Sequence, residues 1–272
     1  GPLSALESGL WLELNSHVLP GHYECLPMKA LLPILLSFSL LGAVSPAPAE
    51  QFRVGVELQP YLPFFAVQDG EYRGYARELL DAFAVSQGHQ FTYVALPVKR
   101  LLSNFLTGDL DFKFPDNPRW KVEQKQGQQI YYSQPVLPYT DGVLVLPRHL
   151  GQGQQRIKVL GTQLGFTPSP YLAQIEGGAM SLTQSNRIDS LLRMAISGRV
   201  DAVYLNPQVA RQALITAGLP GDALLFDPEL AYVDDHYYLS SLRHPEVIAA
   251  FDRFLQQHAE LLRRLKHKYA LE

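Results

Sequence analysis

Cysteine is almost missing from this chain of 272 residues, in which Cys25 is the only one. A single thiol forms no internal disulfide and no Cys-ligated zinc site. The chain also lacks a large excess of charge of either sign, since its net charge is -3. Nothing in that balance favours nucleic acid as a partner.

Common catalytic motifs are missing as well. The sequence has no G-x-S-x-G, H-E-x-x-H, phosphate-binding loop or G-x-G-x-x-G. The nearest approach to a metal cluster is DDHYY (234–238), but adjacent side chains of an extended segment point to opposite sides. We therefore expect no metal and no cofactor, and interpret 234–238 as the start of a strand.

The N-terminal region contains the one long apolar run, ALLPILLSFSLLGAV (30–44). It follows Met28-Lys29 and precedes Ala47-Pro48-Ala49, an order typical of a secretory signal peptide. The run is short for a membrane span, which needs about 20 residues, although a membrane anchor is the alternative. We predict a signal peptide over 28–49, cleaved near Ala49, and interpret 1–27 as an upstream leader or a cloning remnant. Cleavage there would leave a mature chain without cysteine, because Cys25 precedes the cleavage site.

The rest of the chain alternates strand-like and helix-like segments. Residues 51–58 and 90–96 alternate apolar and polar side chains, whereas 75–88 and 98–111 have helical periodicity. The second half has the same order, with expected strands over 157–165, 181–185 and 200–205 and expected helices over 186–197 and 207–218, followed by one or two helices over 246–271. The segments LLSNFLTGDLDF and LLRMAISGRVDAVYL both indicate a helix, a glycine, an aspartate and a strand. This order predicts an α/β fold with parallel strands.

Several segments, taken in order, resemble one protein family. They are FRVGVELQPYLPFF, YRGYARELLDAFAVSQG, GDLDF, NPRWKVEQ, IYYSQPVLPY, KVLGTQLGF and LLRMAISGRVDAVYLNPQVA. Together they resemble the periplasmic, family 3 type of bacterial extracellular solute-binding proteins, most of which bind polar amino acids for ABC importers.

The resemblance implies a fold and a division of the chain. The fold would be the two-lobe, type II periplasmic-binding-protein fold, in which two Rossmann-like α/β lobes are joined by two hinge strands. We place those crossings near 142–146 and 236–241. Lobe 1 would be 50–141 plus 236–272, and lobe 2 would be 142–235. The ligand would lie in the cleft, and the lobes would close on it by a hinge.

The resemblance also implies that Arg119 binds a ligand carboxylate, because a guanidinium pairs with a carboxylate through two parallel bonds. The preceding loop, FKFPDNP, is shorter than is usual in the family, and Asp116 and Asn117 could replace its small hydroxyl residues. The alternative is a surface arginine that stacks on Trp120 or pairs with Glu123.

Further ligand-binding candidates come from the same resemblance. One of Tyr61, Phe64 and Phe65 should line the cleft, since aromatic faces hold apolar or cationic groups. Thr167 could open a helix that meets a carboxylate, or could simply cap it.

Two polar candidates complete the predicted site. The family usually has an acidic residue for the ligand ammonium where this chain has Asn206, and an amide cannot neutralise a cation. Arg100 could also face the cleft. A ligand with net negative charge, or a polar ligand without an ammonium, is therefore an open possibility.

The function predicted from the resemblance is capture of a small polar solute, an amino acid or related carboxylate, in the periplasm for ABC import. The protein would be a monomer, a non-enzyme and the partner of an inner-membrane permease. One alternative is a ligand-sensing partner of a membrane signalling protein. A second is a cyclohexadienyl-dehydratase-like enzyme, for which Glu57 and Glu78 are the candidate carboxylates.

Overall fold

The computed structural model describes residues 49–272. The predicted signal peptide, apart from Ala49, and the segment before it lie outside the described residues. Within 49–272, no helix combines the length and the apolar character that a membrane crossing requires. Residues Pro48–Glu272 form a compact unit of their own.

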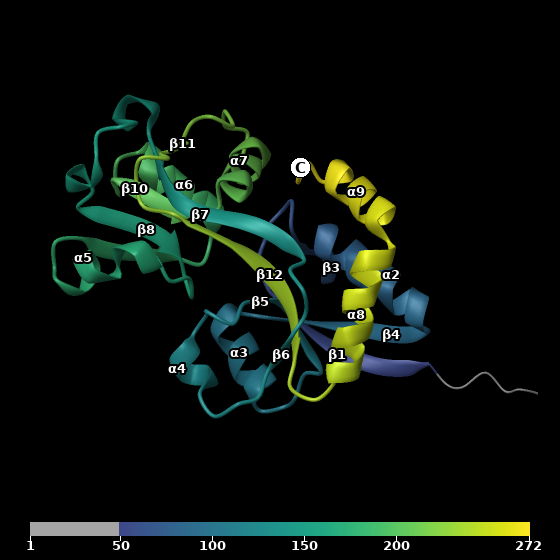
Figure 1. The fold of residues 1–272 in the computed structure, drawn as a ribbon. Coiled ribbons are helices and arrows are strands. Elements are labelled where there is room, and N and C mark those ends of the chain that lie inside the picture. Colours follow the sequence, from purple (N-terminus) through teal and green to yellow (C-terminus); the bar gives the residue numbers. More distant parts are fainter. Residues whose placement is uncertain (1–48) are drawn as a thin grey trace, which may run out of the picture. The chain divides into compact units, whose positions relative to one another are not determined.

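The first lobe is built on parallel strands. β1 (Glu50–Glu57) lies between β4 (His89–Leu96) and β5 (Phe112–Asp116) and pairs in parallel with both. The other elements of this lobe are β2 (Ala66–Gln68), β3 (Glu71–Arg73), α2 (Tyr75–Gln87), α3 (Val98–Leu106), α4 (Val122–Lys125), β6 (Tyr131–Tyr132), α8 (Pro245–Gln257) and α9 (Ala259–Lys268). In Figure 1, the yellow C-terminal helices lie beside α2.

The periodicity of α2 explains how this lobe is held together. Leu79, Leu80 and Phe83 recur on one face of the helix and are completely buried. Phe83 meets Phe251 and Phe254 of α8 at ring-centroid distances of 5.1 and 5.6 Å. Burying each such side chain contributes roughly 1.5–3 kcal/mol, so the C-terminal helix is part of the first lobe's core.

The second lobe repeats the same plan. Its strands β8 (Val159–Gln163), β9 (Ser181–Ser185) and β10 (Ala202–Leu205) pair in parallel, with β8 in the middle. The remaining elements are α5 (Leu172–Glu176), α6 (Ile188–Ile196), α7 (Pro207–Thr216), β11 (Leu225–Phe226) and three short 3₁₀ turns at Pro147–His149, Gln154–Arg156 and Ser169–Tyr171.

The order of helix, glycine, aspartate and strand that occurs in both halves of the sequence has a structural reason. In each half, a glycine with positive φ, Gly108 or Gly198, ends the helix. The aspartate three residues after each of these glycines accepts a backbone N–H from the neighbouring strand. Asp111 accepts from Arg53 at 2.7 Å, and Asp201 accepts from Val159 at 2.8 Å. Both aspartates therefore fix the register of a parallel strand pair.

Two long antiparallel strands join the lobes. β7 (Leu137–Val145) and β12 (Val233–Ser241) pair with each other from Leu137↔Tyr237 to Asp141↔Val233. Beyond that stretch β7 pairs with β10 and β11, while β12 pairs with β5 and β6. Figure 1 shows the two strands running together between the lobes. The fold is the predicted two-lobe α/β fold, with one sheet in the order β4-β1-β5-β12-β7-β10-β8-β9.

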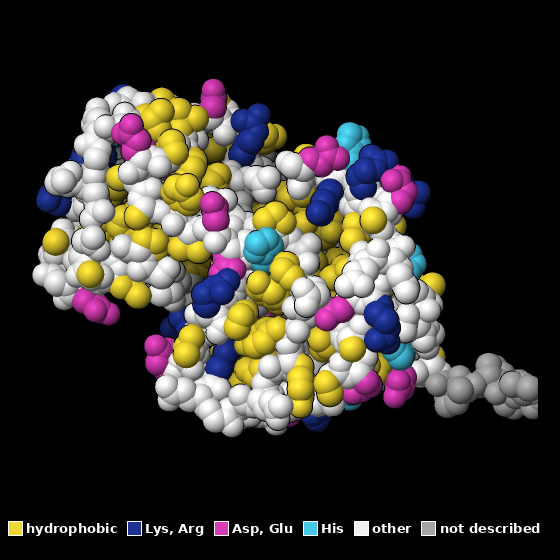
Figure 2. All heavy atoms as spheres, viewed as in Figure 1, with side chains coloured by type: hydrophobic (Ala, Val, Ile, Leu, Met, Phe, Trp, Pro, Cys, Tyr) yellow, Lys and Arg dark blue, Asp and Glu magenta, His cyan; other side chains and the backbone are white. Residues whose placement is uncertain are grey.

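Charged side chains are mixed on the surface. On the face that Figure 2 shows, Lys and Arg are interspersed with Asp and Glu, and no large region of that face carries one sign. This distribution agrees with the net charge of -3.

Candidate ligand-binding cleft

A cavity of about 970 Å³ lies where the two lobes meet. Side chains from both lobes line it, including Lys113 of β5 and Tyr204 of β10, together with residues of both joining strands. Its aromatic lining consists of Tyr61, Phe65, Trp120, Tyr139, Phe166, Tyr204 and Tyr237. The lining also contains eleven acidic or basic residues, and a concave site that combines aromatic with polar groups is typical of small-molecule binding.

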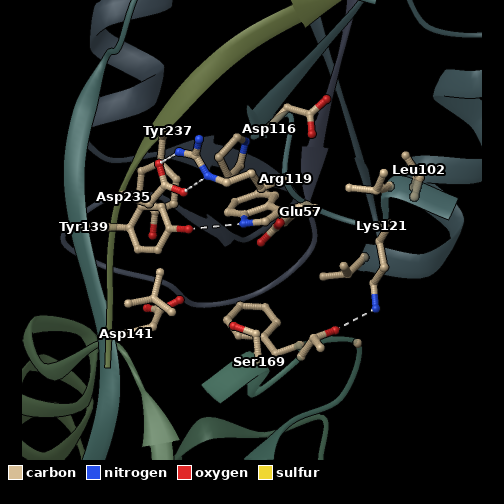
Figure 3. Close-up of a pocket in the computed structure, with 18 of the residues that line it drawn as sticks. Glu57, Leu102, Asp116, Arg119, Lys121, Tyr139, Asp141, Ser169, Asp235 and Tyr237 are labelled. Carbon is tan, nitrogen blue, oxygen red and sulfur yellow. Dashed lines mark hydrogen bonds and ion pairs between the residues drawn. The ribbon is translucent and has the colours of Figure 1, made fainter. Parts of the chain in front are cut away.

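The aromatic wall is held by stacking and by one hydrogen bond. The rings of Tyr139 and Tyr237, on the two joining strands, are stacked with centroids 4.5 Å apart. The indole Nε1 of Trp120 donates to the hydroxyl of Tyr139 at 3.1 Å, as Figure 3 shows. The joining strands therefore supply part of the wall as well as the link between lobes.

Arg119 lines the cavity but is already paired. Its Nε donates to Asp235 Oδ2 at 2.7 Å, and its Nη2 donates to the other oxygen, so the guanidinium binds this carboxylate through both edges (Figure 3). The two predicted alternatives for the arginine, Trp120 and Glu123, are not its partners. A ligand carboxylate would have to compete with Asp235 for this guanidinium.

Asn117 holds the loop that presents Arg119. Its amide donates to the carbonyl of His236 at 2.8 Å, and its Oδ1 accepts the backbone N–H of Arg119 at 2.8 Å. The side chain is completely buried and is absent from the cavity lining. In this structure Asn117 positions the loop and does not reach the cavity.

A network of buried ion pairs lies beside this loop. Asp116 is fully buried and accepts from Lys125 Nζ at 2.8 Å and from Ser240 Oγ at 2.7 Å. Lys113 Nζ lies 3.3 Å from the same carboxylate. Burial alone would raise the pKa of Asp116, but the ammonium groups of Lys113 and Lys125 together with the hydrogen bonds lower it. For Lys125 the effect of burial has the opposite sign and lowers the pKa, because burial disfavours the charged ammonium.

Two other carboxylates face the cavity, and for these the effect of burial on the pKa outweighs that of the neighbouring groups. Burial raises the pKa of Glu57 to about 7, although Lys113 opposes the shift. Burial also raises the pKa of Asp141 to about 7, and the charge of Glu57 adds to that shift. The buried Asp141 Oδ1 has no hydrogen-bond donor among the described residues. Figure 3 shows both carboxylates beside the same cavity.

Polar contacts cross the cleft between the lobes. The amide of Gln163, at the end of β8, donates to Gln59, and Gln59 donates to Glu57 Oε2. Nearer the surface, Lys121 Nζ donates to Thr167 Oγ1 at 2.9 Å. The chain from Gln163 to Glu57 connects the second lobe directly to a cavity carboxylate.

The structure brings some of the predicted site residues together. Tyr61, Phe65, Arg119 and Thr167 all line the cavity, although Thr167 is an exposed partner of Lys121. Their roles toward a ligand stay predictions.

The other predicted residues lie outside the cavity lining. Phe64 is buried edge-on against Tyr237, at a centroid distance of 5.3 Å. Arg100 is an exposed residue of α3. Asn206 caps α7, because its Oδ1 accepts the backbone N–H groups of Gln208 and Val209 at 2.9 and 3.2 Å. Of the two enzyme candidates, Glu57 lines the cavity, while Glu78 pairs with Lys268 on α9.

Sequence reasoning missed several polar lining residues, among them Lys113, Lys125, Asp141 and Asp235. A usable signal existed for two of them. Lys113 stands between two phenylalanines in a strand that is buried throughout, and Asp141 directly precedes the apolar run GVLVL. An ionisable residue inside such a run needs a partner or a function. No cluster of three or more potential metal ligands occurs in residues 49–272.

Comparison with known proteins gives a likeness in structure only. No protein-family model and no curated protein matches the chain. An amino-acid ABC transporter substrate-binding protein from Streptococcus pneumoniae, bound to L-arginine, superposes with a TM-score of 0.63 at 21% identity, covering 82% of this chain and 96% of that one. A histidine kinase sensor domain with similarity to periplasmic binding proteins gives 0.65 at 16% identity, with 82% and 96% covered.

A third solved structure brings an enzyme lineage into the comparison. It is an ancestral amino-acid-binding protein described as a precursor of cyclohexadienyl dehydratase, with a TM-score of 0.60, 18% identity, and 82% and 96% of the two chains covered. At these identities the likeness concerns the fold. The chain has the two-lobe fold of the periplasmic amino-acid-binding proteins.

Proposed function

We propose that this protein captures a small polar solute, an amino acid or a related compound, between its two lobes and closes on it by a hinge. The observation that carries the proposal is the cavity of about 970 Å³, lined by both lobes and by both joining strands. A ligand placed there would touch each lobe, so it would bind the closed arrangement more tightly than an open one. That difference in affinity is what drives closure.

The joining strands are suited to act as the hinge. Between the lobes the chain runs through β7 and β12, whose shared pairing covers Leu137–Asp141 and Val233–Tyr237. The polar contacts from Gln163 to Gln59 and from Lys121 to Thr167 join the lobes only where they meet. Opening the cleft would break these polar contacts and the aromatic contact between Tyr61 and Phe166, whose ring centroids are 5.7 Å apart.

The proposed setting is the periplasm, with a membrane protein as partner. Several solved neighbours are described as substrate-binding proteins of amino-acid ABC transporters, which supports delivery to an importer. The sensor-domain neighbour supports the alternative, in which the closed form is recognised by a membrane signalling protein.

A dehydratase-like enzyme is a second candidate because of Glu57. A carboxyl group with a pKa of about 7 in an aromatic cavity can donate or accept a proton at neutral pH. This candidate predicts that a bound acid is converted, which mass spectrometry of the incubated compound would detect. It also predicts that Glu57→Gln stops conversion while the compound still binds. Recovery of every bound compound unchanged would eliminate it.

The proposal is tested by a thermal-shift screen against amino acids, organic acids and polyamines. A ligand at about 100 times its Kd adds roughly 2.7 kcal/mol to the free energy of unfolding. For a folded region of this size, that corresponds to a rise in Tm of about 5–11 °C. Small-angle X-ray scattering should show a smaller radius of gyration with the same compound. Unchanged melting across the panel, together with unchanged scattering, would refute solute capture.

A further inference from the structure

The polar groups around the cavity are unevenly satisfied. The guanidinium of Arg119 is matched by Asp235, and Lys113 and Lys125 share Asp116. The lining contains six acidic and five basic side chains, so it has one acidic group in excess. The acidic residues are Glu57, Asp116, Glu123, Asp141, Asp234 and Asp235, and the basic residues are Lys99, Lys113, Arg119, Lys121 and Lys125. The cavity therefore has a slight excess of negative charge.

This excess exists only when Glu57 and Asp141 are ionised, and neither of these two carboxyls forms an ion pair among the described residues. Only the amide of Gln59 donates to Glu57, and no described residue donates to the buried Asp141 Oδ1. A buried acceptor without a donor carries an energetic cost, which is larger when the acceptor is charged. A ligand group that carries several N–H donors and a positive charge would remove both costs.

The aromatic side chains near these carboxylates favour the same kind of group. Tyr61 and Tyr237 lie close enough to Asp141 and Glu57 for those charges to affect their hydroxyls, since burial raises the pKa of both tyrosines and the two carboxylates raise it further. Tyr139 stacks on Tyr237 along the same wall. Electron-rich ring faces attract ammonium and guanidinium groups.

We propose that the ligand has a cationic head, an ammonium or a guanidinium, held between Glu57 and Asp141, and that a ligand carboxylate is not required. The inference rests on the proposed function and specifies its ligand class. It replaces the expectation, based on Asn206, that a ligand with net negative charge or without an ammonium was plausible. Asn206 lies outside the cavity lining and caps a helix, so its neutrality says nothing about the charge that the cavity accepts.

Binding of a cation here should release protons near neutral pH. Both carboxyls have a pKa of about 7 in the free protein, and a neighbouring cation lowers the pKa of a carboxyl. Affinity should therefore rise between pH 5 and pH 8 and level off above it. The two carboxyls face each other, and the other titratable and charged groups facing them are Lys113, Asp116, Tyr61, Tyr72 and Tyr237 for Glu57, and Tyr61, Tyr139, Tyr204 and Tyr237 for Asp141.

The test is isothermal titration calorimetry with probes that separate charge from carboxylate. Arginine has cationic groups and a carboxylate, and agmatine has a guanidinium and an ammonium but no carboxylate. Nα-acetylcitrulline has no cationic group on a similar skeleton, and glutarate has two carboxylates and no cation. We expect arginine and agmatine to bind and Nα-acetylcitrulline to bind about 10- to 100-fold more weakly, the value of a hydrogen bond to a charged group. Titrations in buffers of different ionisation enthalpy should show proton release at pH 6–7.

Variants then assign the effect to the two carboxylates. Glu57→Gln and Asp141→Asn should each weaken agmatine binding about tenfold or more and flatten its pH dependence. Asp227→Asn is the matched control, because Asp227 is a buried aspartate outside the cavity lining that accepts backbone N–H groups at 2.9 and 3.0 Å. It should leave agmatine affinity unchanged.

The possible failures are distinct. Nα-acetylcitrulline or glutarate binding as tightly as arginine, or agmatine affinity within twofold of wild type in both variants, would overturn the inference. If no cationic probe binds but another compound of the wider panel does, solute capture stands and the cationic head is wrong. If nothing binds, both proposals fail.

Discussion

Replacing Asp116 by asparagine should strongly destabilise the protein. The carboxylate is fully buried and lies within 2.8 Å of Lys125 Nζ and 3.3 Å of Lys113 Nζ. Asparagine keeps the shape and one acceptor oxygen but removes the only negative charge in contact with both ammonium groups in the described part of the chain. Removing one partner of a buried ion pair typically costs about 3–5 kcal/mol. For a folded region of this length, the Tm should fall by about 6–20 °C.

The pH dependence of the loss identifies its cause. The folded-state pKa of Asp116 is lowered, so its contribution is present above the unfolded value and is lost as pH falls through the folded one. The gap between wild type and variant should therefore shrink below about pH 4, where the unfolded chain protonates this carboxyl. Burial lowers the pKa of Lys125, and without Asp116 it should fall further. Stability of the variant should then recover more steeply as pH rises toward 10.

Chemical denaturation monitored by tryptophan fluorescence and circular dichroism, repeated across pH, measures these changes. Asp222→Asn is the control, since Asp222 is exposed and should change stability by less than about 0.5 kcal/mol. A loss below 1 kcal/mol for Asp116→Asn, or a loss independent of pH, would show that the two lysines do not depend on this carboxylate.

Three further predictions concern single sites. Folding raises the pKa of Glu57 and Asp141 to about 7, so their contribution to stability is complete below about pH 4 and is lost as pH rises through 7. Urea denaturation from pH 4 to 8 should show this decline in the free energy of unfolding, and the decline should be smaller in Glu57→Gln. Asn206→Ala should cost about 1 kcal/mol through loss of the α7 cap, whereas Asn206→Asp should cost less, and equal losses would argue against capping. Arg119→Ala should reduce the ligand-induced rise in Tm. Arg187→Ala, which breaks another exposed ion pair outside the cavity lining, should leave that rise unchanged. The same rise in Tm in both variants would remove Arg119 from the site.

The regular elements were predictable because their signals are local. The helix predicted over 75–88 is α2 (Tyr75–Gln87), and the strand predicted over 51–58 is β1 (Glu50–Glu57). Helical spacing of leucine and phenylalanine, together with Gly88 in the left-handed region, fixes such a helix within a few residues of sequence. Alternating βα order then fixes parallel pairing, since a parallel connection needs a crossover.

The cavity could not be read from the sequence in the same way. Arg119 meets Asp235 across a separation of 116 residues, and no local pattern predicts which carboxylate such an arginine will find. Asn117 and Asn206 were plausible ligand contacts as residue types, yet their amides satisfy backbone groups nearby. Short polar side chains commonly serve such local roles, and only the fold shows which role each has.

By itself the sequence determined the α/β elements and their order, because periodicity, glycine stops and strand order act over short distances, whereas the two-lobe arrangement was expected from the family resemblance. Only the tertiary structure decided which charges face the cavity and which are already paired. Glu57, Asp116, Asp141 and Asp235 are all carboxylates on strands, but burial and neighbouring cations give them different protonation behaviour. Those surroundings come from segments far apart in the chain, and for that reason the chemistry of the cleft appears only once the lobes are assembled.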